Sequence, residues 1–177
     1  MNKGDSMSFL KSVLGLLFAL MLVSLGPAVF AKGRGPSTQG ERVRVLQLTK
    51  VSEANLTSGL SDQDRTWFLT FIQEVPDLTF SAGPVGAWCV KSVKMSQAAA
   101  VVFHFMLAAV AFQIEHPDKA QDAEAVDQAA LESFLRAYQN LVKASPDARS
   151  AELDRAVAMR DQGTLPAFVG QLRAKKK

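Results

Sequence analysis

An apolar stretch in mid-chain constrains this protein more than any other part of its sequence. Residues 97–114 read QAAAVVFHFMLAAVAFQI, and only the two glutamines and His104 among them are clearly polar. An α-helix of this length is about 27 Å long. A helix that is apolar on every side is either buried inside a protein or embedded in lipid. We therefore expect the rest of the chain to be arranged around this helix.

The first 31 residues have the pattern of a signal peptide. A basic residue, Lys11, precedes an apolar core that ends at the helix-breaking pair Gly26-Pro27. Val29 and Ala31 are fairly small residues at the positions that a signal peptidase recognises. We expect cleavage after Ala31 and a periplasmic or secreted mature protein. The alternative is that the leader is kept as an anchor helix.

The charge balance argues against a nucleic-acid partner. The leader contains two of the 20 basic and one of the 17 acidic residues, so residues 32–177 hold 18 and 16. This small positive surplus does not indicate nucleic-acid binding. The basic residues gather at both ends of this part, and we expect them to form solvated tails. A weak contact of these termini with an anionic membrane surface is the functional alternative, because each basic residue there contributes about 1 kcal/mol.

Residues 41–56 allow two interpretations. Arg42-Val43-Arg44-Val45 alternates as a strand would, whereas an apolar stripe at helical spacing comprises Val43, Leu46, Val51 and Ala54. We favour a helix with this stripe, because a single strand would have no partner in an otherwise helical chain.

The other apolar residues also follow helical spacing. The helices that we expect besides the central one cover residues 61–75, 122–144, 145–163 and 164–173. The first begins at a capping Ser61, and Ser145-Pro146 has the composition of another helix start. These elements predict an all-α fold, a compact bundle of five or six helices around a buried central helix at about 97–115.

The domain organisation follows from these elements. We expect a flexible N-terminal segment at 32–40, a single helical domain at 41–173 and a basic tail at 174–177. The alternative is a membrane-anchored protein with two spans, since the central stretch reaches the lower end of the spanning range. His104 near its middle disfavours lipid around it. We therefore expect the central helix to be buried in protein.

Few residues here have the chemistry of a catalytic or metal site. The chain lacks the glycine-rich phosphate-binding loops and the HExxH, CxxC and GxSxG motifs. One cysteine and two histidines are too few for a Cys/His zinc site. We therefore expect no metal and no cofactor, and we disfavour an enzyme without excluding one. A nucleophile pair of Cys89 with His104 or His116 is a minor alternative.

Three polar features have both a structural and a functional interpretation. Cys89 follows Trp88 in an apolar run, which favours a small buried side chain over a reactive thiol or an intermolecular disulfide. His104 is expected to be a neutral, hydrogen-bonded core residue. A solvated helix junction is favoured over a metal site for the group Glu115, His116, Asp118 and Asp122.

An apolar segment with loop-forming residues suggests a binding role. Residues 77–87 contain Gly83-Pro84 and predict a loop, which either packs over the core or forms a recognition surface. In the second case Phe80, Val85 and Trp88 are the candidate partner-binding residues, because aromatic anchors dominate interface energies. We expect a small exported bacterial envelope protein that binds a partner protein in an inhibitor, immunity or chaperone-like role. A binder of an apolar small molecule or lipid in the helical core is the alternative.

Overall fold

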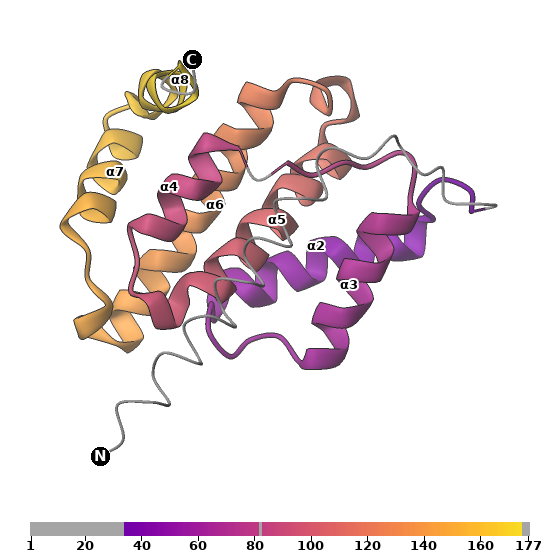
Figure 1. Cartoon of the computed structure of the whole chain (residues 1–177), viewed down its shortest axis with the longest axis horizontal. Helices are drawn as coiled ribbons and strands as arrows, with labels where there is room; N and C mark the ends of the chain where they lie inside the picture. The colour runs from indigo at the N-terminus through magenta and orange to yellow at the C-terminus, as the bar shows by residue number, and fades with distance from the viewer. Residues whose placement is uncertain (1–33, 82, 175–177) are drawn as a thin grey trace, which may run out of the picture. The chain divides into compact units, whose positions relative to one another are not determined.

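A computed structural model describes residues 34–81 and 83–174, which form seven α-helices and no strand (Figure 1). The predicted all-α bundle is therefore confirmed. The helices are α2 (Gln39–Ala54), α3 (Asp62–Glu74), α4 (Pro84–Lys91), α5 (Ala98–Glu115), α6 (Ala123–Ala144), α7 (Ala151–Asp161) and α8 (Leu165–Ala174). Single 3-10 turns lie at Met95–Gln97, Pro117–Lys119 and Pro146–Ala148. The predicted leader at 1–31 and residues 175–177 of the predicted tail lie outside the described residues.

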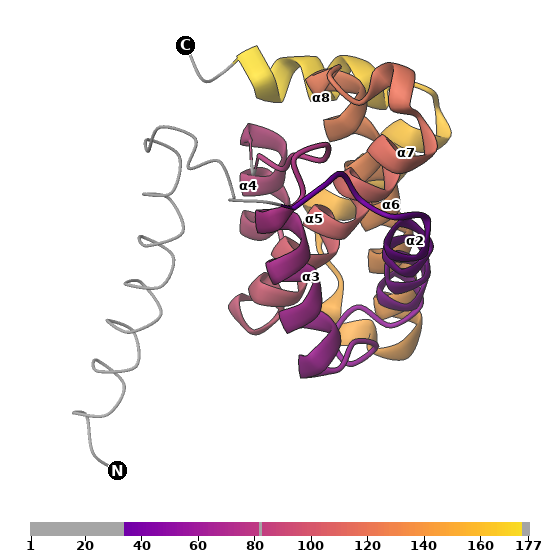
Figure 2. The same ribbon diagram turned by 90° about the vertical axis from the view of Figure 1, so that its right-hand side faces the viewer.

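Helix α5 is the central helix that the apolar stretch predicts. Of its 18 residues, 11 are buried, and only Ala99 and Glu115 are exposed. Helices α2, α4 and α6 pack along it, as Figures 1 and 2 show. Within the described residues one helix, Met95–Glu115, is long and apolar enough to cross a membrane. Here its apolar surface is covered by the neighbouring helices instead.

Two apolar clusters meet at α5. The first lies among α4, α6, α7 and α8 and includes Phe105 of α5. The second lies among α2, α3 and α5, where the ring of Phe68 meets that of Phe103 edge-on at 5.4 Å. Because α5 contributes side chains to both clusters, its burial holds the two sides of the bundle together.

The buried face of α2 is not the apolar stripe that the sequence suggested. Its buried residues are Val45, Leu48 and Ser52, whereas Val43 and Val51 are 41% and 44% exposed. Apolar residues occur on both faces of this helix, so spacing alone did not distinguish them. The hydroxyl of Ser52 is buried because it has a hydrogen-bond partner in His104 of α5.

Hydrogen bonds hold Ser37 in the described part of the segment that was predicted to be flexible, and Gln39 and Gly40 of that segment belong to α2. The backbone N–H and the hydroxyl of Ser37 donate to the Asp77 carboxylate at 2.8 and 2.6 Å. Arg42 pairs with the same carboxylate at 2.9 Å. Thr38 then caps α2 in a capping box with Glu41, so the helix begins at Gln39.

The apolar segment at 77–87 is only partly a loop, because α4 begins at Pro84. Proline suits the first turn of a helix, where its missing N–H costs nothing. Gly86 then lies against Phe105 of α5, and a Cβ at Gly86 would be 3.3 Å from Phe105 Cε1. The absence of a side chain at Gly86 therefore lets α4 approach α5 closely.

Gly86→Val tests this close approach. We expect it to lower the free energy of unfolding by about 2 kcal/mol, since the added methyls overpack the contact with Phe105. Ala87→Val is the matched control on the exposed side of the same helix and is expected to change stability by less than about 0.5 kcal/mol. Chemical denaturation of both variants measures the difference. Equal effects would show that the contact with Phe105 does not limit the packing of α4.

Candidate functional site

The structure separates the three predicted partner-binding residues. Val85 is fully buried in the first apolar cluster, so it presents no surface to a partner, and that part of the prediction is corrected. Phe80 is half-buried and packs against both clusters. Gln113 of α5 holds the neighbouring Thr79 through two hydrogen bonds, at 2.7 and 3.2 Å. Trp88 is half-buried and lines a surface depression.

The depression at Trp88 lies between α4, α7 and α8. It has a volume of about 120 Å³, with Ala156, Met159 and Phe168 as its other apolar lining residues. The ring of Phe168 meets the Trp88 ring edge-on at a centroid distance of 5.1 Å, a favourable aromatic geometry. Glu152 and Arg155 of α7, both exposed, complete the lining. The site therefore combines an ordered aromatic pair with charged side chains.

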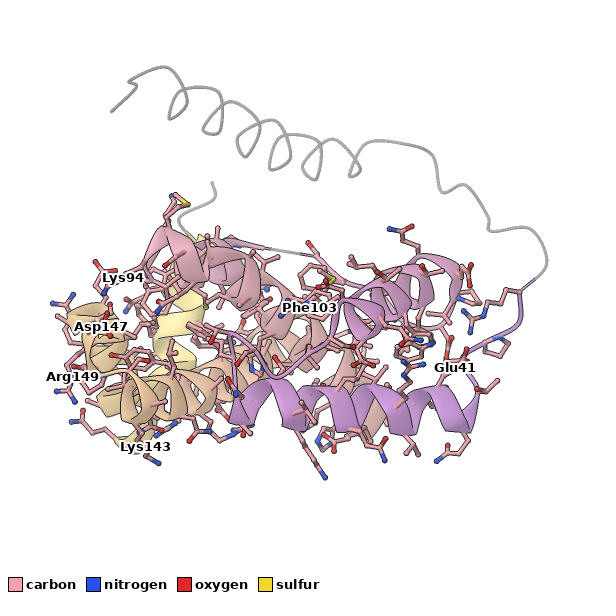
Figure 3. The ribbon with its side chains drawn as sticks, turned by 90° about the horizontal axis from the view of Figure 1, so that it is seen from below. Glu41, Lys94, Phe103, Lys143, Asp147 and Arg149 are labelled. Atoms are coloured by element: carbon pink, nitrogen blue, oxygen red, sulfur yellow. The ribbon has the colours of Figure 1, made fainter. Side chains whose placement is uncertain are left out.

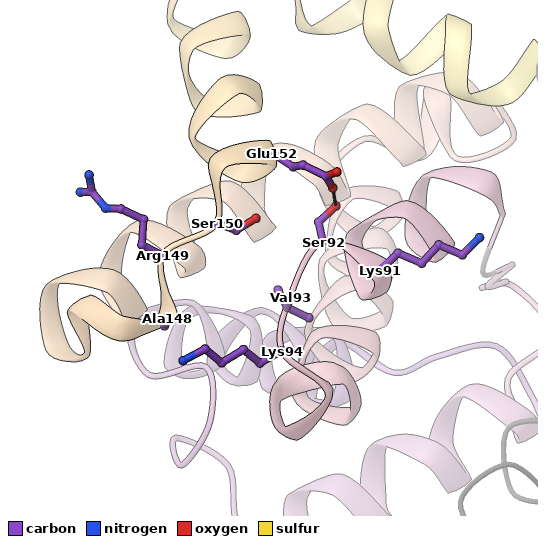
Figure 4. Close-up of a pocket in the computed structure, with 8 residues that line it drawn as sticks. All are labelled: Lys91, Ser92, Val93, Lys94, Ala148, Arg149, Ser150 and Glu152. Carbon is purple, nitrogen blue, oxygen red and sulfur yellow. Dashed lines mark hydrogen bonds between the residues drawn. The ribbon is translucent and has the colours of Figure 1, made fainter.

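A second depression of about 310 Å³ adjoins the first and shares Glu152 with it (Figure 4). It is formed where α4 ends and where the chain enters α7. Its lining residues are Lys91, Ser92, Val93, Lys94, Ala148, Arg149, Ser150 and Glu152. Ser92 Oγ lies within hydrogen-bond distance of two acceptors, Trp88 O at 2.9 Å and Glu152 Oε2 at 3.1 Å, so α4 and α7 meet here. We refer to the residues lining the two depressions as the α4–α7 surface.

The turn Pro146–Ala148 helps to shape this surface. Ser145-Pro146 was expected to start a long helix, but the chain makes only one 3-10 turn there, and α7 begins at Ala151. The hydroxyl of Tyr138 accepts a hydrogen bond from Ser150 N at 2.9 Å and donates to Asp154 at 2.8 Å. Tyr138 of α6 thus fixes the start of α7.

Four cations line the α4–α7 surface, and two of them are free of ion pairs. Lys94 pairs with Asp147 at 2.9 Å, and this contact lowers the pKa of the Asp147 carboxyl. Arg149 lies 3.8 Å from Asp154. Figure 3 shows Lys94, Asp147 and Arg149 gathered at one end of the molecule. Within residues 34–81 and 83–174, Lys91 and Arg155 form no ion pair.

Cys89 is a buried structural side chain. It lies one turn after Val85 on the inner side of α4, is free and is fully buried. Burial raises the pKa of its thiol, which disfavours the thiolate needed for nucleophilic attack. Both ring nitrogens of His104 bond to serines, and His116 lies in an exposed turn. The predicted alternative of a Cys89–His pair is therefore not formed.

His104 has a hydrogen-bond partner at each ring nitrogen. Nδ1 lies 3.0 Å from Ser52 Oγ of α2, and Nε2 lies 3.1 Å from Ser133 Oγ of α6. Ser133 donates its single hydroxyl proton to Glu53 Oε2 at 2.8 Å, so its oxygen accepts from His104 Nε2–H. Nδ1 is then free to accept from Ser52. This network joins α2, α5 and α6 and assigns the tautomer of the ring.

The network is structural, because the histidine and both serines are inaccessible to a substrate. His104, Ser52 and Ser133 are all buried. Burial lowers the pKa of His104 to about 4, although the Glu53 carboxylate raises it. The prediction of a neutral, hydrogen-bonded core histidine agrees with these contacts. Its partners Ser52, Ser133 and Glu53 were not predicted, because they come from distant parts of the sequence.

The acidic group at the end of α5 is a helix junction. Glu115, His116, Asp118 and Asp122 are all exposed, and Asp122 caps α6 by accepting from the backbone N–H of residues 124 and 125. In the described part of the chain, no three His, Cys, Asp or Glu side chains lie together so that they could hold a metal ion.

Comparison with known proteins adds no further assignment. No family model matches the chain, and neither the curated proteins nor the solved structures contain a match. The candidate site therefore rests on the geometry of the α4–α7 surface alone.

The lowered pKa of His104 predicts that acid destabilises the fold. The unfolded chain protonates this ring below about pH 6.5, whereas the folded chain does so only below about pH 4. The unfolded state binds the proton first as the pH falls, so we expect a loss of about 3 kcal/mol of unfolding free energy between pH 6.5 and pH 4. His104→Gln does not titrate and should show a shallower dependence in denaturant titrations across this range. Equal slopes for the two proteins would contradict the assignment.

The burial of Cys89 predicts that its thiol is inert in the native protein. We expect iodoacetamide to alkylate Cys89 on the order of a hundredfold more slowly in the folded protein than in guanidinium-unfolded protein, because the reagent must await opening of the fold. Mass spectrometry of the intact chain follows the reaction. Rapid alkylation of the folded protein would revive the reactive-thiol hypothesis.

Proposed function

We propose that this chain is a small exported protein of the bacterial envelope that acts by binding a partner protein through the α4–α7 surface. The observation that carries the proposal is the depression at Trp88, where an aromatic pair and a methionine lie partly exposed beside Arg155, which forms no ion pair within residues 34–81 and 83–174. By contrast, the candidate catalytic groups Cys89 and His104 are buried. This contrast supports a binding role over an enzymatic one.

The fixed packing of Trp88 against Phe168 supports recognition of a protein. Tryptophan is enriched among residues that dominate binding energies, and such residues lie at the centre of an interface with polar groups around them. Trp88 is held against Phe168 and against the first apolar cluster, so little rotamer freedom is lost when a partner binds. The surrounding charged residues have the character of an interface rim.

The alternative of an apolar ligand in the helical core receives less support. No α5 residue lines either depression, and most α5 side chains are buried against neighbouring helices. The apolar depression, at about 120 Å³, is also smaller than the roughly 300–1,000 Å³ typical of small-molecule pockets. Its size favours an inserted protein side chain over a whole small molecule.

Site-specific photo-crosslinking in the native bacterium tests the proposal. A photoreactive benzoylphenylalanine at the exposed position Ala87, next to Trp88, is expected to yield a discrete protein adduct. The same residue at exposed Lys50 on α2 is the matched control and is expected to yield none. Adduct formation at Lys50 alone, or at neither position, would overturn the proposed surface.

A further inference from the structure

We infer that the partner segment occupying the α4–α7 surface is acidic and inserts one apolar side chain between Trp88, Met159 and Phe168. The inference rests on the proposed function and adds the chemistry of the partner. It joins two observations, a small apolar depression and the four cations that, with one carboxylate, line the two depressions together.

The charge of the surface selects an acidic partner. Its lining contains the cations Lys91, Lys94, Arg149 and Arg155, and Glu152 is the only carboxylate among the lining residues of the two depressions. Asp147 and Asp154 lie beside them and offset Lys94 and Arg149. The cations left without an ion pair in the described residues are Lys91 and Arg155. A partner carboxylate that approached them would gain attraction without breaking an existing pair.

The positions of the two free cations fit one segment of chain. Lys91 lies one turn after Trp88 on α4, and Arg155 lines the Trp88 depression from α7. Glu152 lines both depressions, and its carboxylate lies 3.1 Å from the hydroxyl of Ser92. A partner segment that crosses from one depression to the other therefore passes Lys91 and Arg155. Its carboxylates would face these cations, and an apolar side chain between the carboxylates would enter the apolar depression.

An anionic membrane is a different partner for the same charges, and the concave shape of the surface argues against it. The apolar residues Trp88, Met159 and Phe168 are only partly exposed and lie within a depression. A peripheral membrane contact instead lays a convex apolar face into the lipid interface. We therefore commit to a protein segment and make the membrane an outcome of the test.

Charge reversal at the free cations is the central variant of the test. Lys91→Glu with Arg155→Glu removes both attractions. Both side chains are exposed and form no ion pair in the described part of the chain, so we expect an unchanged fold. Lys50→Glu with Lys119→Glu is the matched control, because these lysines are exposed, line neither depression and give the same change in net charge. Thermal unfolding of both variants checks that the fold is intact.

The probe is a synthetic peptide with a central leucine between glutamates. Two companion peptides carry lysine in place of glutamate or serine in place of leucine. NMR titration of the full chain follows the indole N–H of Trp88, which Trp67→Phe distinguishes from the other tryptophan. We expect the glutamate–leucine peptide to shift this signal and to bind about tenfold more weakly to the charge-reversed variant, with the control variant unchanged.

Several results would overturn the inference. These are equal binding of the lysine or serine peptide, an unmoved Trp88 signal, or equal affinity of wild type and the charge-reversed variant. The chain could instead bind phosphatidylglycerol vesicles in a way that depends on Lys91 and Arg155, and not bind the peptide. This result would identify an anionic membrane as the partner and contradict the protein segment. If charge reversal left the yield of the adduct at Ala87 unchanged, the inference of an acidic partner would be contradicted, but the proposed function would still hold. Absence of the adduct in the wild-type chain would contradict both the acidic partner and the proposed function.

Discussion

Burial of one uniformly apolar helix is the constraint on which the rest of this structure depends. Helix α5 has no polar face to turn toward water, so every neighbouring helix contributes apolar side chains to cover it. Its one buried ionisable side chain, His104, is compatible with burial because two serines satisfy both ring nitrogens while the ring stays neutral. The same helix among lipids would place this network in hydrocarbon, where such groups are costly.

The candidate surface is a consequence of how α5 is covered. Gly86 lets α4 lie close to α5, and the turn spacing of the helix then directs Val85 and Cys89 inward. Trp88 and Lys91 lie on another side of the same helix and line the two depressions that α4 forms with α7 and α8. Packing of the core thus decides which residues of a short apolar segment remain available to a partner.

Part of the candidate site was accessible from the sequence. Trp88 stood out as an aromatic residue in an apolar segment, and the single cysteine and the mid-helix histidine favoured structural roles. The sequence predicts a loop where α4 in fact begins at Pro84, so it does not indicate that the side chain of Val85 points inward. Met159, Phe168 and Arg155 were missed as site residues, since no spacing rule connects them with Trp88. They meet it only because α7 and α8 fold back over α4.

The sequence by itself determined the helical class, the central position of residues 97–115 and the places where most helices begin and end. These features follow from local hydrophobic spacing, capping residues and proline, which act over a few residues. Only the tertiary structure decided which face of α2 is buried and which residue binds Ser37. It also decided that serines of α2 and α6 form hydrogen bonds with both ring nitrogens of the histidine in α5. It further decided that Arg155 of α7 lines the depression at Trp88. Contacts between residues distant in sequence carry this information, and no local pattern encodes them.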